Sequence, residues 1–211
     1  MATFATLIDD ARYDLRDYQT GLEFDDDELL NFINRMIRLL ESTLTSLNSD
    51  LVHGTATLSF LISTNSLDIA TALNSGKWDS IRSLWNGTDK LEKVSLDELY
   101  TIRQNASTQT GAPDFWALGG TVLQFDKTSA AAHSLTCYYN SKTGTVTASS
   151  TTPYNGIFDD SLREMLVMHA KAKKEGILAK SEMMYSELFR KRAMEIELRR
   201  SFIPKTYSID F

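Results

Sequence analysis

The stretch GAPDFWALGGTVLQFD, residues 111–126, has the sequence pattern of a β-hairpin. It contains a proline, a tryptophan, a pair of glycines and then a short alternating run that ends at Phe125. Two glycines suit the positive φ angles that a two-residue hairpin turn requires, so we predict a turn at Gly119-Gly120 with a strand on either side. The hairpin bears directly on fold class, because it places β structure in the middle of a chain whose two ends look helical.

The N-terminal end of the chain predicts two helices. Residues 3–17 place apolar side chains on one face of a short amphipathic helix. A longer helix starts at Asp25, an N-cap residue that is followed three residues later by Glu28 in a capping box, and the acidic residues there favour the positive end of the helix dipole. The apolar stripe of this second helix consists of Leu29, Phe32, Ile33, Met36, Ile37, Leu40, Leu44 and Leu47.

The C-terminal part of the chain also has helical spacing, from a cap at Asp159 or Asp160 to residue 200. Gly176 either divides this stretch into two helices or is a tolerated glycine within one long helix, and the pattern leaves both possibilities open. Because none of the terminal helices can bury its apolar stripe alone, we expect them to pack together.

The middle of the chain has the two-residue period of strands. Besides the hairpin, strands are predicted within residues 55–63, 66–70, 78–87 and 134–140. A short helix interrupts them, with Ser95 and Glu98 as its capping box. Residues 141–157 are rich in Ser and Thr and are expected to form a loop.

Together these patterns predict an α+β fold that is mainly α. We expect a helical bundle built from the N- and C-terminal helices, a small antiparallel β-rich insert in the middle, and an extended C-terminal tail, as a single domain with an embedded subdomain. The predicted parts are bundle helices at 1–50, the insert with one short helix at 51–157, bundle helices at 158–200 and a docking tail at 201–211.

The composition indicates a soluble globular protein, with 42% hydrophobic and 24% charged residues among 211. The net charge of −6 argues against a protein whose main task is to grip nucleic acid through its phosphates. The single cysteine, Cys137, excludes an intramolecular disulfide and fits folding in a reducing cytoplasm. No run of about 18 apolar residues exists and the first residues do not resemble a signal peptide, so we expect no membrane segment.

Charge is distributed unevenly along the chain. Residues 1–30 contain nine acidic and two basic residues, whereas residues 171–200 contain nine basic and five acidic residues. Either these two poles pair between neighbouring copies of the chain, or both are solvated helix faces. The candidate inter-subunit residues are Asp25, Asp26, Asp27, Arg190, Lys191, Arg192, Arg199 and Arg200.

The last eleven residues, SFIPKTYSIDF, differ from the helical stretch before them. Pro204 cannot continue a helix, and we do not expect an extended peptide with five large apolar side chains to stay in water. This tail either folds back on its own subunit or docks on a neighbour, by adding a strand or by filling pockets. The candidate partner-binding residues are Phe202, Ile203, Pro204, Tyr207, Ile209 and Phe211.

No motif predicts a catalytic site, a cofactor or a metal. There is no Gly-rich phosphate loop, and Cys137 and the three histidines lack the spacing of zinc ligands. Three adjacent acids at Asp25–Asp27 are far more often dipole complements than metal ligands. The aromatic residues of the middle region either fill a small β core, the commoner case, or form a carbohydrate-binding face. They are Trp78, Trp85, Trp116, Tyr138 and Tyr139.

The order of these segments resembles the head–tail adaptor (connector) proteins of tailed bacteriophages, over nearly the full chain. LIDDARYDLRD followed by FDDDELLNFINRMIRLLES is similar to the family's opening, a short helix, a gap and a long helix with an acidic start. VSLDELYTIRQN, GAPDFWALGGTVLQFD and LTCYYN match its run of short helix, Gly-x-Pro-x-aromatic turn, hairpin and strand ending in Tyr-Tyr. FDDSLREMLVMHAKAKKEG and MMYSELFRKRAME are similar to its C-terminal helices.

The resemblance implies a structural virion protein in the neck of the phage particle, assembled in the host cytoplasm, and not an enzyme. It implies a homo-oligomeric ring, commonly of twelve copies, with the portal protein above and a tail or nozzle protein below. Genomic DNA would pass through the central channel without sequence-specific binding, and no membrane would be involved. The C-terminal tail would insert against the portal or a neighbouring subunit.

The residues leave two other functions open. A carbohydrate-binding or host-attachment module that uses the aromatic residues of the insert predicts a monomer or trimer that binds glycans. A cell-wall hydrolase with an unmarked site predicts a pair of carboxylates with perturbed pKa values facing a pocket.

Overall fold

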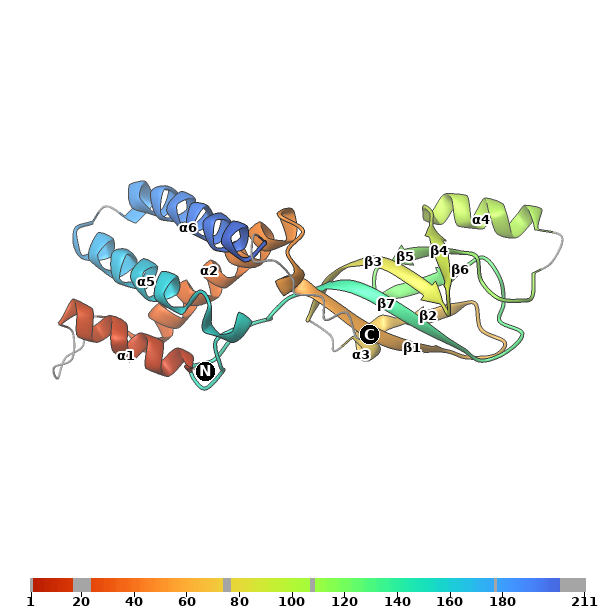
Figure 1. The fold of residues 1–211 in the computed structure, drawn as a ribbon, viewed down its shortest axis with the longest axis horizontal. Coiled ribbons are helices and arrows are strands. Elements are labelled where there is room, and N and C mark those ends of the chain that lie inside the picture. Colours follow the sequence, from red (N-terminus) through yellow and green to blue (C-terminus); the bar gives the residue numbers. More distant parts are fainter. Residues whose placement is uncertain (1, 17–23, 74–76, 107–108, 177, 202–211) are drawn as a thin grey trace, which may run out of the picture. The chain divides into compact units, whose positions relative to one another are not determined.

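A computed structural model of the chain contains two compact units, one formed by Met1–Leu51 with Thr145–Phe211 and the other by Val52–Gly144. The structure describes residues 2–16, 24–73, 77–106, 109–176 and 178–201. Figure 1 labels the helices and strands in chain order. Each unit buries its own set of apolar side chains.

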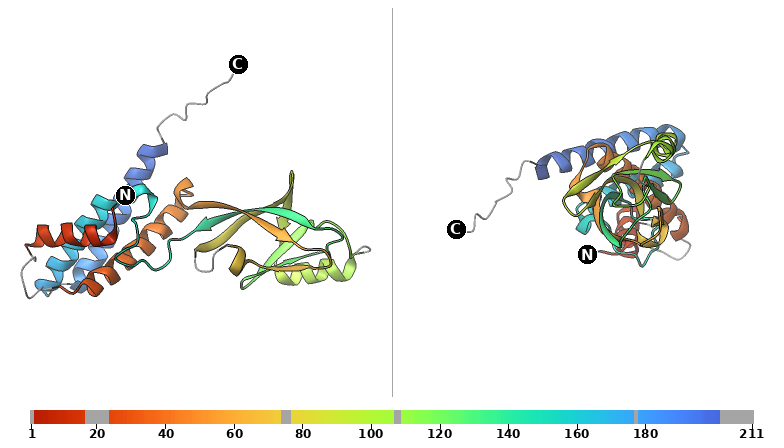
Figure 2. Two further views of the ribbon diagram at one scale, coloured as in Figure 1. Left: turned by 90° about the horizontal axis from the view of Figure 1, so that it is seen from below. Right: turned by 90° about the vertical axis from the view of Figure 1, so that its right-hand side faces the viewer.

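The described part of the first unit contains four α-helices. They are α1 (Phe4–Leu15), α2 (Asp26–Ser46), α5 (Asp159–Lys174) and α6 (Leu178–Ser201). Helix α5 contacts α1, α2 and α6, and the views of Figures 1 and 2 agree that the four helices lie side by side. The predicted apolar stripe of α2 is confirmed, because its residues from Leu29 to Leu44 are buried; only Leu47, which follows the end of the helix, is exposed.

The start of α1 is closed by the segment that the sequence assigned to a loop. The N–H of Phe4 donates to the carbonyl of Ser150 at 3.1 Å, and the N–H of Ala5 donates to the carbonyl of Ala148 at 2.8 Å. The first N–H groups of a helix have no acceptor within the helix, so these carbonyls satisfy donors that α1 cannot satisfy itself. The loop is therefore an integral part of the helical unit.

Asn34 on α2 holds the same segment from the other side. Its Nδ2 donates to the carbonyl of Val146 at 3.2 Å, and its Oδ1 accepts a hydrogen bond from the N–H of Val146 at 2.8 Å. Nδ2 also donates to the carbonyl of Leu30 at 3.0 Å. Asn34 and Val146 are both buried, so a single side chain satisfies both backbone polar groups of a residue in the core.

Gly176 divides the C-terminal helical stretch into two helices. Helix α5 ends at Lys174 and α6 begins at Leu178. Gly176 has φ +69°, the left-handed conformation that commonly ends a helix, and its N–H donates to the carbonyl of Lys173 at 3.0 Å. Of the two possibilities left open by the sequence, the structure has the break.

The described part of the second unit is built on seven strands. They are β1 (His53–Phe60), β2 (Ser66–Asp68), β3 (Trp78–Asn86), β4 (Asp89–Lys93), β5 (Phe115–Gly119), β6 (Val122–Phe125) and β7 (His133–Ser141). The helices α3 (Ile69–Ala72) and α4 (Leu96–Asn105) belong to the same unit. The strand order is β1-β7-β3-β4-β5-β6-β2, with β4 and β5 parallel and the other pairs antiparallel.

The predicted fold, a helical bundle with a small antiparallel β-rich insert, is wrong. The structure is a seven-stranded mixed, curled sheet with helices, and the sheet forms a compact unit of its own. The error arises at β4, which is charged at four of its five positions and buries only Leu91, so it lacks the apolar alternation that marks a strand. Helix α4 then joins β4 to β5, and a connection of this length allows the two strands to run parallel.

The sheet curls around one hydrophobic core. The ring centroids of Phe60 on β1 and Phe125 on β6 are 4.4 Å apart, although these strands are well separated in the strand order. Helix α3 contacts both strands, and Figure 2 shows the curl from two further directions. The buried core residues are Leu58, Phe60, Ile69, Leu73, Ile81, Leu84, Leu91, Trp116, Leu123, Phe125, Leu135 and Cys137.

Cys137 is fully buried in this core, at the centre of β7. Burial disfavours the charged thiolate and raises the pKa of the thiol to about 11. The side chain therefore stays protonated at neutral pH and acts as a small apolar residue of the core.

The hairpin within residues 111–126 is confirmed as β5 and β6, but its turn lies one residue later than predicted. Gly119 pairs with Val122, so the central turn residues are Gly120 and Thr121. Gly120 alone has a positive φ, +64°, which is the requirement of a type II′ turn. The register places Leu123 and Phe125 in the core, and this fixes the turn more strongly than the pair of glycines does.

The strand predicted within residues 66–70 is only partly present. β2 ends at Asp68, whose Oδ1 accepts a hydrogen bond from the N–H of Ala70 at 2.9 Å and so caps α3. The N-cap preference of aspartate ends the strand, because Ile69 already belongs to the helix.

Candidate functional site

The acidic end of α2 carries three of the charged residues singled out in the sequence. Asp25 caps the helix by accepting a hydrogen bond from the N–H of Asp27 at 3.3 Å. Both side chains are exposed, and together with Glu28 they line a surface depression whose floor includes Phe32 and His169. His169 is buried, and its ring stacks on Phe32 with centroids 3.8 Å apart. The depression therefore has a mainly acidic rim, which also includes Arg35, above an aromatic floor.

Asp26, the third acid, has a partner within its own subunit. The buried Arg12 of α1 donates from Nε and Nη2 to Oδ1 of Asp26, at 3.1 and 2.5 Å, and from Nη2 to the carbonyl of Phe24 at 2.7 Å. This arrangement ties α1 to the start of α2. The charge of Asp26 thus contributes to the fold of the subunit.

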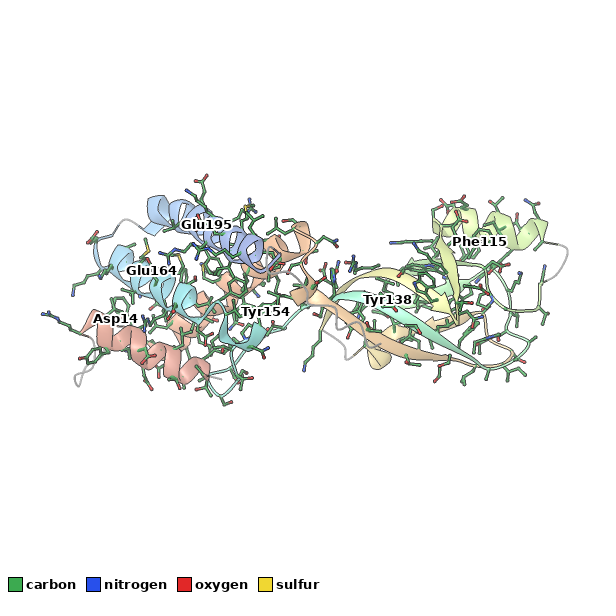
Figure 3. All side chains as sticks on the ribbon, viewed as in Figure 1. Asp14, Phe115, Tyr138, Tyr154, Glu164 and Glu195 are labelled. Atoms are coloured by element: carbon green, nitrogen blue, oxygen red, sulfur yellow. The ribbon has the colours of Figure 1, made fainter. Side chains whose placement is uncertain are left out.

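The basic candidates on α6 divide in the same way. Arg192 donates to both carboxylate oxygens of Glu164 on α5, a bidentate pair within the subunit. The side chains of Arg190, Lys191 and Arg199 are exposed. In Figure 3, Glu164 and Glu195 mark α5 and α6.

The tail candidates and one basic candidate fall outside the described part of the chain. Phe202, Ile203, Pro204, Tyr207, Ile209 and Phe211 lie outside the described residues, as does the side chain of Arg200. For the tail, the sequence remains the basis of the prediction.

The aromatic residues of the second unit do not share one exposed face. Trp116 is fully buried in the core, and Trp78, Trp85 and Tyr139 are half-buried. Tyr138, labelled on β7 in Figure 3, is 42% exposed. A carbohydrate-binding face built from all five is therefore not present, because the ring of Trp116 packs into the core.

The acidic pair at the start of α5 has a structural role. Burial raises the pKa of Asp159, whose Oδ2 accepts a hydrogen bond from the hydroxyl of Thr152 at 3.1 Å, and Asp160 beside it is exposed. Both residues lie in the first turn of α5, where carboxylates complement the helix dipole.

The described residues contain no cluster of His, Cys, Asp and Glu suited to a metal ion. None of the described helices is long and apolar enough to cross a membrane.

Sequence reasoning did not single out a second group of charges, formed by Arg82 on β3 with Lys90 and Lys93 on β4. These residues line one depression together with Trp116. The available signal was the segment DKLEK, in which one apolar residue stands between charged neighbours. It could not be interpreted without knowing that β4 is a strand.

In the first unit, acidic side chains are exposed at the start of α2 and basic side chains are exposed on α6. The chain belongs to the SU10 adaptor protein family, whose model matches residues 2–205. This is a family of phage head–tail adaptors, so the resemblance found in the sequence is confirmed and the chain is a structural component of a phage virion. No curated protein matches the chain.

Proposed function

We propose that the chain forms an oligomeric ring, of twelve copies, between the portal protein and the tail, and that this ring surrounds the channel through which genomic DNA passes. Membership of a head–tail adaptor family supports this proposal. The observation from this chain that supports it is an excess of exposed acids at the start of α2 and of exposed bases on α6, which also exposes Glu187 and Glu195. Asp25 and Asp27 stand at the start of α2, whereas Arg190, Lys191 and Arg199 stand on α6.

In a ring, the acidic rim of one subunit faces the basic positions of the next subunit at every interface. An exposed ion pair contributes only about 0.2–1 kcal/mol, so these charges do not supply the affinity of the ring. Their role is to set the register between neighbours and to disfavour wrong pairings, since like charges in contact are unfavourable.

The C-terminal tail supplies the affinity in this proposal. Its five large apolar residues are Phe202, Ile203, Tyr207, Ile209 and Phe211. A large apolar side chain contributes about 1.5–3 kcal/mol when it is fully buried, which exceeds the contribution of any of the exposed ion pairs. The tail therefore acts as an arm that docks on the portal protein or on a neighbouring subunit.

The net charge of −6 is consistent with a channel through which DNA moves. Proteins that hold DNA neutralise its phosphates with Lys and Arg, whereas an acidic wall repels them and lets the duplex slide. Assembly of the ring would take place in the host cytoplasm before the tail protein joins it.

A charge exchange tests the contact between subunits. Reversing the acidic side with Asp27→Lys, or the basic side with the double variant Arg190→Glu/Lys191→Glu, is expected to raise the protein concentration needed for ring assembly at least about tenfold, which corresponds to about 1.4 kcal/mol per contact. Combining both changes in one chain restores opposite charges across the interface, so assembly should recover. Sedimentation velocity with and without the portal protein measures the assembled fraction.

The matched control is Asp9→Lys/Asp10→Lys, which makes the same kind of charge reversal on exposed positions of α1. It should leave assembly unchanged. If the single-side variants assemble like the control, or if the combined variant assembles no better than they do, the proposed pairing is wrong.

A further inference from the structure

A cleft lies within the second unit where β3 and β4 separate. The two strands pair only from Leu84 to Asn86 on β3, opposite Asp89 to Leu91 on β4. Beyond Leu91, β4 leaves β3, and Glu92 and Lys93 pair instead with β5. Phe115, the β5 residue opposite Glu92, is labelled in Figure 3. Among the described strands, the first part of β3 pairs with β7 alone, and its last two residues, Arg82 and Ser83, line the cleft.

The cleft is positively charged in a chain that is acidic as a whole. Arg82, Lys90 and Lys93 line it against one acid, Glu92, and all four side chains are exposed. The ammonium group of Lys93 lies 5.3 Å from the centroid of the Trp116 ring, which lines the same cleft. Three cations around one depression favour an anionic ligand.

The backbone of β3 is irregular at the residue that carries one of these cations. The register with β7 shifts between Ile81 and Ser83, which makes Arg82 the extra residue of a β-bulge. Bulges redirect a side chain and recur next to functional sites, but they also protect sheet edges from unwanted pairing. A second observation is needed to choose between these two roles.

Trp116 supplies that observation. Its side chain is fully buried, and its indole N–H has no acceptor in the described part of the chain. The N–H of a buried tryptophan usually finds a hydrogen-bond partner, so an unmatched donor beside a cationic cleft points to an acceptor oxygen supplied by a ligand. Simple protection of an edge does not explain this unmatched donor.

We propose that the cleft between β3 and β4 binds an extended acidic segment of a partner protein. The backbone of the segment adds to the open edge of β3, as in other cases of strand addition. Its carboxylates, which alternate along a strand, meet Lys90 and Lys93, and an acceptor oxygen satisfies the N–H of Trp116. The open strand edge favours a peptide over a phosphate ligand, because a phosphate does not use backbone hydrogen bonds of this kind. The inference does not depend on the ring, since the residues all belong to the second unit.

The probe is a blocked heptapeptide in which glutamate alternates with valine, titrated into the full chain and followed by isothermal calorimetry or fluorescence anisotropy. The variant Lys90→Glu/Lys93→Glu is expected to weaken binding at least tenfold. Lys142→Glu and Lys77→Glu/Lys142→Glu are controls, which reverse charge on the same unit outside the cleft and should leave binding within twofold. Far-UV circular dichroism melts confirm that the variants, all at exposed positions, remain folded.

Two further ligands separate strand addition from general attraction of anions. The same heptapeptide with N-methyl groups on alternate amides keeps its carboxylates but cannot complete the backbone ladder, and it should lose at least tenfold in affinity. A short single-stranded DNA oligonucleotide should not compete with the unmodified peptide at equal charge. Equal binding of the methylated peptide, effective competition by the oligonucleotide, or loss of binding in the Lys142 controls would each overturn the proposal, as would the absence of any binding.

Discussion

Deleting residues 201–211 is expected to abolish attachment of the chain to its portal protein, while the melting temperature stays within a few degrees of the full-length value. The reason is that every buried apolar residue in the described part of the chain precedes the deleted segment, the last being Ala193. The tail nevertheless contains five large apolar side chains, whose burial on a partner is the main source of affinity in the proposed assembly. Co-sedimentation with portal rings measures attachment, and calorimetry measures the melting temperature.

A tail of the same length in which the apolar residues are replaced by serine serves as the matched control for the deletion. It keeps the chain length and tests whether side-chain burial carries the effect. Normal attachment of the truncated chain would remove the tail from the account, and a large drop in its melting temperature would show that the tail folds back on its own subunit.

The variant Asn34→Ala is expected to lose about 2–4 kcal/mol of folding stability, because it leaves the N–H and the carbonyl of Val146 buried without their partners. For a chain of this size, such a loss lowers the melting temperature by about 10 °C. Urea denaturation and calorimetry measure the two quantities. The effect is large for one polar side chain because Asn34 fastens residues 145–152 to α2, and these residues in turn close the start of α1.

Asn31→Ala is the control for this prediction. Asn31 lies on the same helix, but its side chain is exposed, so the same substitution removes no buried hydrogen bond. The prediction fails if the two variants have similar stabilities. Asn34→Asp gives a third point, since it keeps an acceptor for the N–H of Val146 but removes the donor to its carbonyl.

The helices, and the starts of α2 and α4, could be predicted from the sequence because their signals are local, whereas the cap predicted at Asp159 or Asp160 is wrong because α5 starts after Phe158. Asp25 caps α2, and Ser95 caps α4 by accepting from the N–H of Glu98 at 3.2 Å, both from patterns that span three or four residues. Strand β7 and the hairpin β5–β6 could likewise be predicted, because alternating apolar residues and turn residues are recognised within short windows of sequence.

The sheet as a whole could not be predicted, because its size depends on pairings between distant residues. β1 pairs with β7, so that Phe60 lies opposite His133, and no local pattern connects these two segments. β4 was missed since only Leu91 faces the core, while its charged neighbours face outward. Without β4, the parallel pairing with β5 and the curled sheet do not follow, and the β region is taken for a small insert.

Only part of the candidate site could be predicted from the sequence, for a similar reason. The sequence identified which charges are concentrated at each end of the chain, but not which of them are already used within the subunit. Asp26 pairs with Arg12 and Arg192 pairs with Glu164, and each pair joins two consecutive helices through side chains that no local sequence pattern connects. The remaining candidates have exposed side chains and form no such pair among the described residues. They are Asp25, Asp27, Arg190, Lys191 and Arg199.

Electron microscopy of the protein at high concentration, alone and mixed with its portal protein, tests the central claim most directly. Rotational averaging of the particles reveals any symmetry and any central channel. The account predicts rings with a channel that appear, or extend the portal ring, when the portal protein is present. Monodisperse monomers that ignore the portal protein would contradict it.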